Sequence, residues 1–245
     1  MKKVLVIGES CCDVFKYGNV TRLEPSAPVP VFNSIYENEN PGMAHNVLNN
    51  LLTLGVSSDI HTNENWKNIT KTRFVEKKTN HMFLRVDEND KGYGRSSVKE
   101  IDYSLYDAVI ISDYDKGFLT VEDMKHVKSR HETVFLDTKK PIGEWALDCA
   151  TYIKINNYEL AKSEEVTEEL REKLIVTLGP DGASHKGVTY TVPSVEIKDL
   201  SGAGDTFISG LVKRYIENKD ICSSIDFANE CATKVVQKRG VSVVA

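Results

Sequence analysis

The sequence of 245 residues predicts an α/β fold in which helices cover both faces of a central, mostly parallel β-sheet. Short apolar runs rich in valine and isoleucine indicate buried strands at residues 3–7, 108–112, 133–136 and 173–178. Longer segments with apolar residues at every third or fourth position predict helices at residues 44–54, 121–129, 205–218 and 221–238. Strands that are apolar throughout need cover on both faces, so their alternation with helices favours a parallel sheet.

A third observation concerns residues 29–32, 72–76 and 82–87, which look like β-strands with no helix between them. We expect a small antiparallel flap here, a lid with strands drawn from about residues 14–36 and 71–87. A lid above the carboxyl ends of the parallel strands would cover a ligand bound there. If its strands lack enough core of their own, pairing with a second subunit would bury them, so we expect a homodimer through the lid.

Composition, charge and the N-terminus narrow the class of function. No linker rich in proline, glycine, serine or charge divides the chain, so residues 1–245 are expected to form a single domain. The formal net charge of −5 argues against general binding of nucleic acid or of an anionic membrane. The apolar run after the N-terminal lysines is too short for a secretory signal and no later stretch could span a bilayer, which favours a cytoplasmic protein.

The most informative segment is Asp-Leu-Ser-Gly-Ala-Gly-Asp-Thr-Phe at residues 199–207, directly before an apolar helix. Gly202, Ala203 and Gly204 would leave backbone N–H groups bare at the helix start, where the helix dipole also favours a transferring phosphoryl group. Asp205 would lie in the first turn, close enough to accept a proton from an attacking hydroxyl. The alternative is that the glycines serve a tight loop and that Asp205 is an N-cap. The sequence has no G-x-x-x-x-G-K-[ST] loop, which argues against a P-loop kinase.

This segment resembles the C-terminal signature of the PfkB, or ribokinase-like, carbohydrate kinases. The resemblance covers nearly the whole chain, and it implies a ribokinase-like fold, ATP as phosphoryl donor and Mg²⁺ as cofactor. It also implies that Asp205 is the general base and that the Gly-Ala-Gly turn is the anion hole.

Two segments resemble the sugar-binding motifs of that family. Asp13, after the first strand, is similar to an aspartate that contacts the sugar, and the segment Pro-Gly-Met-Ala-His-Asn supplies Gly42 and Asn46. The two acceptor oxygens of Asp13 could bind adjacent hydroxyl groups. The alternatives are that Asp13 only forms a turn and that Asn46 is an exposed polar residue of a helix.

Other segments resemble the nucleotide-binding elements of the family. The residues that the resemblance places near the nucleotide are Asn156, Glu159, Thr177, Gly179, Gly182 and Asn229. Glu159, in the N-x-x-E element, would help to place Mg²⁺ through water, and its alternative is a helix cap. Asp199 would help to hold a monovalent cation such as K⁺, and its alternative is a loop-capping role.

Residues 22–31, 80–87 and 112–117 are most similar to the D-glycero-D-manno-heptose 7-phosphate kinases, a subfamily that phosphorylates the anomeric hydroxyl of a sugar phosphate. Arg85 and Lys116 suit a phosphorylated substrate, and the lid could present Arg22 to the site of a neighbouring subunit. The alternative for these three residues is an ordinary solvated charge.

The acceptor stays open, because several positions depart from the heptose pattern. Met43 replaces a glycine of the sugar motif, and Thr138 replaces a proline. Alternatives are a kinase for another sugar, sugar phosphate or nucleoside, or a catalytically weak sugar- or nucleotide-binding module. The segment at residues 55–71 is also shorter than in the family, so we expect the helices and the strand that the family has there to be trimmed or lost.

Overall fold

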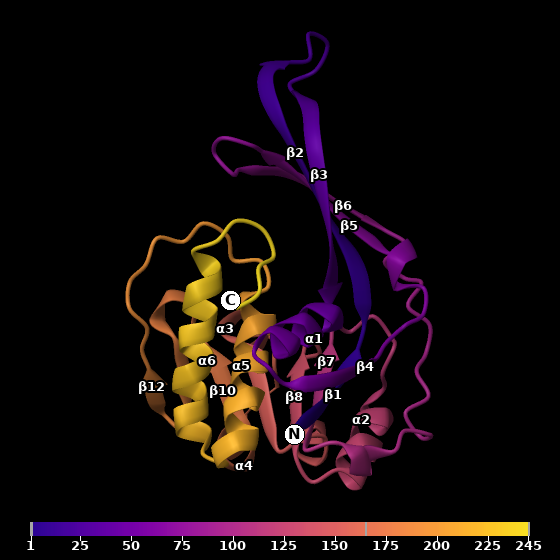
Figure 1. The fold of residues 1–245 in the computed structure, drawn as a ribbon, viewed down its shortest axis with the longest axis vertical. Helices are drawn as coiled ribbons and strands as arrows, with labels where there is room; N and C mark the ends of the chain where they lie inside the picture. The colour runs from indigo at the N-terminus through magenta and orange to yellow at the C-terminus, as the bar shows by residue number, and fades with distance from the viewer. Residues whose placement is uncertain (1, 165, 245) are drawn as a thin grey trace.

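The computed structural model describes residues 2–164 and 166–244, and these form a larger sheet and a smaller one (Figure 1). The strands of the larger sheet are β1 (Lys3–Gly8), β4 (Ser57–His61), β7 (Ala108–Asp113), β8 (Val134–Thr138), β9 (Tyr152–Asn156), β10 (Leu174–Thr177), β11 (Ala183–His185) and β12 (Val188–Tyr190). Their order is β12-β11-β10-β9-β8-β7-β1-β4. Neighbouring strands from β10 to β4 in this order are all parallel. Within the described residues of this sheet, only the two pairs made by β11, with β10 and with β12, are antiparallel. The predicted parallel sheet is thus confirmed.

Four of its strands, β1, β7, β8 and β10, lie within two residues of the predicted bounds, whereas β4, β9, β11 and β12 were not predicted. Strand β4 lies within residues 55–71, where we expected the helices and the strand of the family to be trimmed or lost. The chain passes from β4 through one 3-10 turn, η1 (Trp66–Asn68), into the smaller sheet at Thr70.

Helices cover both faces of the larger sheet, as predicted. They are α1 (Ala44–Thr53), α2 (Val121–Arg130), α3 (Asn157–Leu160), α4 (Glu168–Lys173), α5 (Ala203–Asn218) and α6 (Ile221–Val236), with 3-10 turns η2 (Tyr103–Leu105), η3 (Glu144–Asp148) and η4 (Gly179–Asp181). Side chains of α1, α5 and α6 share one core with Val4, Val6 and Phe135. Those of α2 and α4 share the other core with Leu5 and Ile7. Successive residues of β1 therefore serve opposite cores, which is why that strand is apolar throughout.

The smaller sheet contains the strands predicted to form a lid, and we call it the lid. It contains β2 (Ser10–Leu23), β3 (Pro30–Met43), β5 (Thr70–Glu76) and β6 (Met82–Glu88), in the order β3-β2-β5-β6. The β2–β3 and β5–β6 pairs are antiparallel, but the central β2–β5 pair is parallel, which corrects the antiparallel flap predicted from the sequence. The sheet also extends beyond residues 14–36, because the polar residues near the end of β3 pair with β2 through their backbone although they carry no strand signal.

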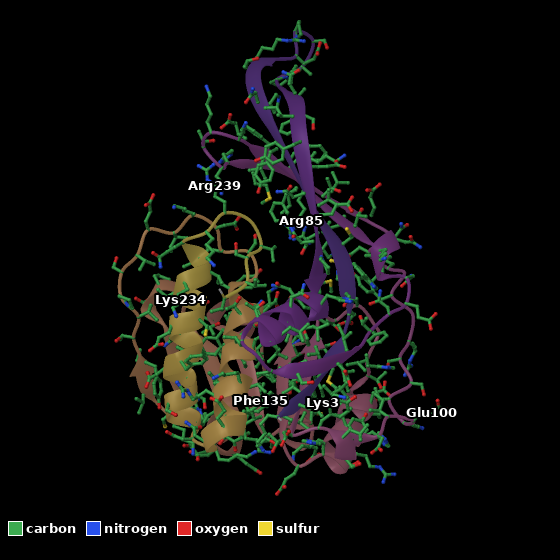
Figure 2. The ribbon with its side chains drawn as sticks, viewed as in Figure 1. Lys3, Arg85, Glu100, Phe135, Lys234 and Arg239 are labelled. Atoms are coloured by element: carbon green, nitrogen blue, oxygen red, sulfur yellow. The ribbon has the colours of Figure 1, made fainter. Side chains whose placement is uncertain are left out.

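The chain order places a site at one edge of the larger sheet. From β1 the chain adds β4 on one side and β7 on the other, which makes the carboxyl end of β1 a topological switch point. The helix α1 follows the lid hairpin, whose long strands project from the body in Figure 1. Figure 2 shows the contrast between the parts: Phe135 is buried in the body, and Arg85 lies on the lid. Among the described helices, none is both long enough and apolar enough to cross a membrane.

Candidate active site

The site begins at the N-terminus of α5. The helix starts at Ala203 rather than at Asp205, and Gly202 is its N-cap in the left-handed region, at φ 80°. A side chain at Gly202 would bring its Cβ to 2.6 Å from Asn46 Nδ2, so this position requires glycine for both conformation and space. The Ala203 amide donates to Leu200 O at 3.2 Å, which closes the turn before the helix. The helix thus begins in a tight turn beside α1.

Asp205 is not the N-cap, which excludes the alternative raised from the sequence. Its side chain is 8% exposed; Oδ2 accepts a hydrogen bond from Asn46 Nδ2 and Oδ1 one from Tyr114 Oη, each at 2.8 Å. Burial raises the pKa of Asp205 to about 6, with Asp137 raising it further and Asn46, Tyr114 and Lys154 lowering it. A carboxylate with this pKa is mostly ionised at neutral pH, yet it accepts a proton more readily than an exposed aspartate. The arrangement suits a general base.

Two lysines, the buried Lys154 and the half-buried Lys139, lie beside the same helix start, and sequence reasoning missed both. Lys154 Nζ would be 2.9 Å from a Cβ on Gly204, so its ammonium group occupies the space that a side chain would fill. Lys154 pairs with Asp137 at 2.8 Å, and Lys139 Nζ lies 3.7 Å from the same carboxylate. A lysine inside the apolar strand β9 was the available signal, because a buried strand carries a charge only where a partner holds it.

Asn156 and Glu159 form a capping box at the start of α3. The Glu159 amide donates to Asn156 Oδ1 and the Asn156 amide donates to Glu159 Oε2, each at 2.8 Å. The other carboxylate oxygen of Glu159 accepts a hydrogen bond from Lys139 Nζ at 2.5 Å. The capping alternative is therefore realised, and the same carboxylate also lies beside the lysines near α5.

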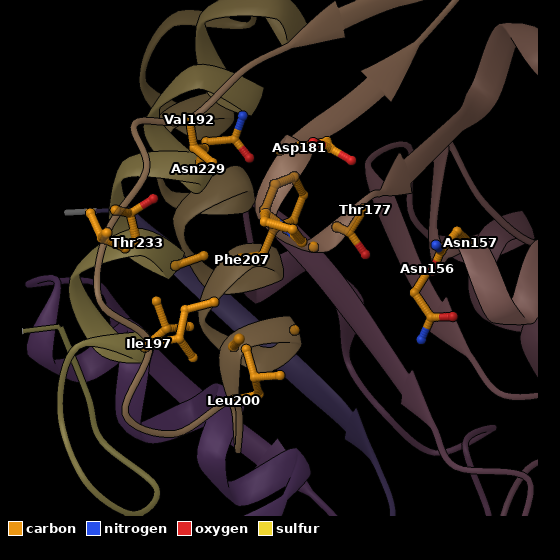
Figure 3. A pocket seen from close by; sticks show the side chains of 18 of the residues that line it. Asn156, Asn157, Thr177, Asp181, Val192, Ile197, Leu200, Phe207, Asn229 and Thr233 are labelled. Atoms are coloured by element: carbon orange, nitrogen blue, oxygen red, sulfur yellow. The ribbon is translucent and has the colours of Figure 1, made fainter.

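A cavity of about 560 Å³ adjoins the helix start (Figure 3). Residues placed near the nucleotide from the sequence line it, namely Asn156, Thr177, Gly179, Gly182 and Asn229. Its apolar wall includes Val192, Ile197, Leu200, Phe207 and Val236. The cavity reaches Ala203 and Gly204, so it adjoins the first turn of α5. A space of this size and lining suits a nucleotide with its base among the apolar residues.

Within the lid, the structure brings together Asp13, Gly42 and Arg73. Asp13 is buried in β2 rather than in a turn, and its Oδ1 accepts a hydrogen bond from Arg73 at 2.5 Å. A Cβ on Gly42 would overlap Asp13 Oδ2, so only glycine allows the two strands to place this carboxylate. Asn46 is also buried, which excludes the exposed alternative, and it contacts Asp205 directly. Arg73 was not predicted as a site residue.

The remaining predicted site residues are three basic residues associated with the lid, Lys116, Arg85 and Arg22, and Asp199 in the loop directly before α5. At the base of the lid, Lys116 Nζ donates to Asp90 at 2.5 Å, and Arg85 makes two hydrogen bonds to Asp87, at 2.7 and 2.9 Å. Arg22 is exposed near the distal end of β2. Asp199 accepts hydrogen bonds from the Ser201 and Gly240 amides at 2.8 and 3.0 Å, which is the loop-capping geometry.

Comparison with known families decides the assignment. The profile described as pfkB family carbohydrate kinase matches residues 40–244. The chain belongs to the pfkB family of carbohydrate kinases. Membership agrees with the motif at residues 199–207 and places the chain among the ATP-dependent carbohydrate kinases.

Relatives in this family include bacterial proteins named Bifunctional protein HldE. The chain is 29% identical over 300 residues to the one from Helicobacter pylori strain J99, covering 100% of this chain and 65% of the relative. It is 30% identical over 292 residues to the one from a Nitratiruptor species, covering 98% of this chain and 62% of the relative. The chain therefore spans less than two thirds of the length of these curated relatives.

Solved structures share the fold. Arabidopsis thaliana ribokinase, determined with ribose and ATP, matches with a TM-score of 0.71 at 16% identity, covering 98% of this chain and 94% of that one. A nucleoside kinase from Methanocaldococcus jannaschii matches with a TM-score of 0.70 at 16% identity, covering 100% and 94%. The predicted ribokinase-like fold is confirmed.

Proposed function

We propose that the protein transfers the γ-phosphate of ATP to a hydroxyl group of a sugar phosphate, with D-glycero-D-manno-heptose 7-phosphate phosphorylated at O1 as the leading candidate. One observation carries the phosphotransfer: the cavity that suits a nucleotide reaches Ala203 and Gly204, and the Asp205 carboxylate follows in the same helix turn, where Asn46 and Tyr114 hold it. The two halves of the reaction would therefore meet at the start of α5. The choice of heptose phosphate is supported by the resemblance at residues 22–31 and 112–117.

The reaction follows from this placement. The sugar hydroxyl lies between Asp205 and the γ-phosphate, Asp205 accepts its proton, and the hydroxyl oxygen attacks phosphorus in line with the departing ADP. The backbone amides at Gly202–Gly204, the helix dipole and the Lys154 ammonium group stabilise the charge on the transferring phosphoryl group. Closure of the lid excludes water, which would otherwise compete as the acceptor.

The donor set near α5 fits Mg²⁺. Glu159 and Asp137 supply carboxylate oxygens, and Asp137 Oδ1 is buried without a hydrogen-bond partner among the described residues. Among the residues that the structure describes, no group of three or more acidic, histidine or cysteine side chains could hold a metal ion by itself. Most ligands of Mg²⁺ would therefore be water and phosphate oxygens. When bound, the ion would neutralise charge on the phosphates. We also propose that Asp199 helps to hold K⁺. Escherichia coli phosphofructokinase-2, which has a similar fold, has a crystal structure in complex with potassium.

The acceptor would bind between the lid and the body. Asp13 and Asn46 are proposed to contact sugar hydroxyls, and Arg85 and Lys116 to attract a phosphate at the far end of the acceptor. Both cations already have carboxylate partners, so the acceptor phosphate would share them with Asp87 and Asp90. ATP as the donor makes the cytoplasm the expected compartment.

We propose a homodimer through the lid. Large apolar side chains are exposed on it, among them Leu23, Ile35, Met82, Leu84 and Val86. Its strands β3 and β6 are also sheet edges with unpaired backbone groups. A second lid would bury such side chains and satisfy such an edge.

An acceptor panel tests the function. ADP release would be measured with D-glycero-D-manno-heptose 7-phosphate, the unphosphorylated heptose, fructose 6-phosphate, ribose and adenosine, each against ATP hydrolysis without acceptor. We expect the largest kcat/KM for the heptose phosphate, with a much lower value for the heptose that lacks the phosphate. Preference for ribose or adenosine would instead establish the sugar or nucleoside alternative. Nucleotide binding by calorimetry without turnover on any acceptor would establish a binding module and refute the proposal.

A further inference from the structure

Tyr114 makes a contact that neither the family motif nor the proposed reaction assigns. Its hydroxyl donates to Asp205 Oδ1 at 2.8 Å, while Asn46 holds Oδ2 at the same distance. Each carboxylate oxygen therefore has its own donor, and the two donors lie 91 and 159 positions away in the sequence. A carboxylate held at two oxygens keeps one orientation and retains one free lone pair on each oxygen for a hydroxyl proton.

The segment that carries Tyr114 is not part of a helix or strand, and a buried carboxylate holds it. Glu9 is fully buried and follows β1 directly; its Oε2 accepts the Tyr114 amide at 2.8 Å and its Oε1 accepts the Lys116 amide at 3.1 Å. Two residues in this segment, Asp115 and Gly117, have φ values of 56° and 88°, so its backbone follows an unusual course. The Glu9 side chain supplies the acceptors that such a backbone needs.

Glu9 also connects to the other residue that holds Asp205. Its carbonyl oxygen accepts the amide of Ala44 at 2.9 Å, at the first residue of α1, and Asn46 lies on the first turn of that helix. One buried residue thus fixes both the segment that presents Tyr114 and the helix that presents Asn46.

We propose that Tyr114 and Glu9 are positioning residues for the phosphotransfer: Tyr114 orients the Asp205 carboxylate, and Glu9 fixes the backbone that carries Tyr114. This inference rests on the proposed role of Asp205 as general base. If the Tyr114 hydrogen bond serves the reaction, removing the hydroxyl should change the protonation of Asp205 and the turnover together, which gives the inference a specific readout.

The expected readout follows from the charges around Asp205. Asp137 on β8 raises its pKa, whereas Lys154 on β9 and the donors Asn46 and Tyr114 lower it. Burial raises the pKa of Tyr114 well above its ordinary value, so its phenol stays protonated and donates throughout the working pH range. Removing this donor leaves the carboxylate buried with one partner fewer, which disfavours its charged form.

The test compares Tyr114→Phe with Tyr106→Phe in the intact protein. Tyr106 is the matched control, because its hydroxyl also donates to an aspartate, Asp59, at 2.8 Å, but on the surface of the body. We expect Tyr114→Phe to lower kcat/KM for the sugar acceptor about tenfold, as for loss of a hydrogen bond to a charged group, and to move the acidic limb of the pH–rate profile to higher pH. Tyr106→Phe should leave both unchanged. An unmoved limb for Tyr114→Phe would overturn the proposal, whatever happens to the rate.

Two further variants guard against a folding defect. Tyr114→3-fluorotyrosine keeps the ring and strengthens the donor, so the limb should move in the opposite direction, to lower pH. Glu9→Gln replaces one acceptor by a donor facing a backbone amide, so it should move the limb in the same direction as Tyr114→Phe while nucleotide affinity is retained. No movement in either variant would contradict the positioning role.

A second measurement separates this proposal from the proposed function. ¹³C NMR of proteins labelled at aspartate carboxyl carbons, assigned with Asp205→Asn, reports the titration of Asp205 without any turnover. If the wild-type protein phosphorylates no acceptor but Tyr114→Phe still raises the titration midpoint of Asp205, the proposed function fails and the contact stands. If turnover is present and the midpoint is unchanged in Tyr114→Phe, the inference fails alone.

Discussion

Strand β7 of the body is buried along its whole length, whereas strand β6 of the lid is exposed along its whole length. The body buries its parallel strands between two helical layers, with β1 residues Val4 to Ile7 at most 3% exposed. The lid has no helical layer of its own, and side chains as large as Leu84 remain 55% exposed on it. Burial on both faces makes the body rigid, whereas the order of the lid depends on the surfaces that pack against it.

The distribution of the site follows this difference. The base, the helix start and the lysines belong to the body, where close packing fixes their positions. The residues proposed to select the acceptor, such as Asp13 and Arg85, belong to the lid. We therefore expect body substitutions to change turnover or global stability, and lid substitutions to change acceptor use and assembly.

The largest effect is expected at Asp205. Asp205→Asn preserves the shape but removes the base, so kcat should fall at least about 10³-fold while nucleotide binding by calorimetry persists. Asp59→Asn, another aspartate bonded to a tyrosine, is the control and should keep full activity. The lid counterpart Asp13→Asn should raise KM for the acceptor more than it lowers kcat. Full activity of Asp205→Asn would remove the proposed mechanism.

A pair of glycines compares the two regions in stability. A Cβ on Gly8, in β1, would overlap the backbone oxygen of Ser112, and one on Gly18, in β2, would overlap that of Asn33. In the body the neighbouring strand cannot yield, so Gly8→Ala should reduce the free energy of unfolding by about 3 kcal/mol. In the lid the edge hairpin can separate locally, so Gly18→Ala should cost less than about 1 kcal/mol in global unfolding. Denaturant titration measures both, and equal losses would show that the lid unfolds together with the body.

How far the sequence predicts the fold depends on the same contrast between the buried strands of the body and the exposed strands of the lid. Strands β1, β7, β8 and β10 are apolar runs, and burial on both faces produces such runs directly. Strand β9 was missed because the buried ion pair of Lys154 interrupts its apolar pattern. The predicted strand at β3 was too short because backbone pairing holds the polar end of β3. Such pairing does not require particular side chains, so the sequence does not show it.

The site divides in a similar way. The position of Gly202 and Gly204 at a helix start was predictable because it depends on the local backbone of one segment. Tyr114, Arg73 and Glu9 were missed as site residues because their roles arise from contacts between distant segments. The sequence does not show which partner folding will bring to a carboxylate or a phenol in a loop. The predicted roles of Asp13, Arg85 and Glu159 in binding stay predictions.

The pH dependence of turnover should report the titration of Asp205, a residue of the body. Because burial raises the pKa of Asp205 to about 6, the base is protonated below that value. We expect kcat/KM to fall up to tenfold per pH unit below about pH 6, and to level off about one pH unit above it. The stability contributed by this raised pKa has the opposite trend: it is present below the ordinary aspartate pKa and lost as pH rises through about 6. Initial rates at acceptor concentrations well below KM measure the profile, and a limb near pH 4 would contradict the assigned base.

The smallest effect on stability, and the sharpest on assembly, is expected from Leu84→Glu on the lid. Leu84 lies opposite Phe74 on the β5–β6 pair, and Phe74 packs edge-on against Phe32, so a charge there would disrupt an apolar face available to a second lid. We expect the variant to shift the protein from dimer to monomer in light scattering at micromolar concentration, while the melting temperature of the body changes little. Leu105→Glu is the matched control, since Leu105 is a similarly exposed leucine on the body, 59% against 55%, and it should leave the assembly unchanged. A wild-type protein that is already monomeric would refute the dimer, and a large loss of body stability in Leu84→Glu would refute the independence of the two regions.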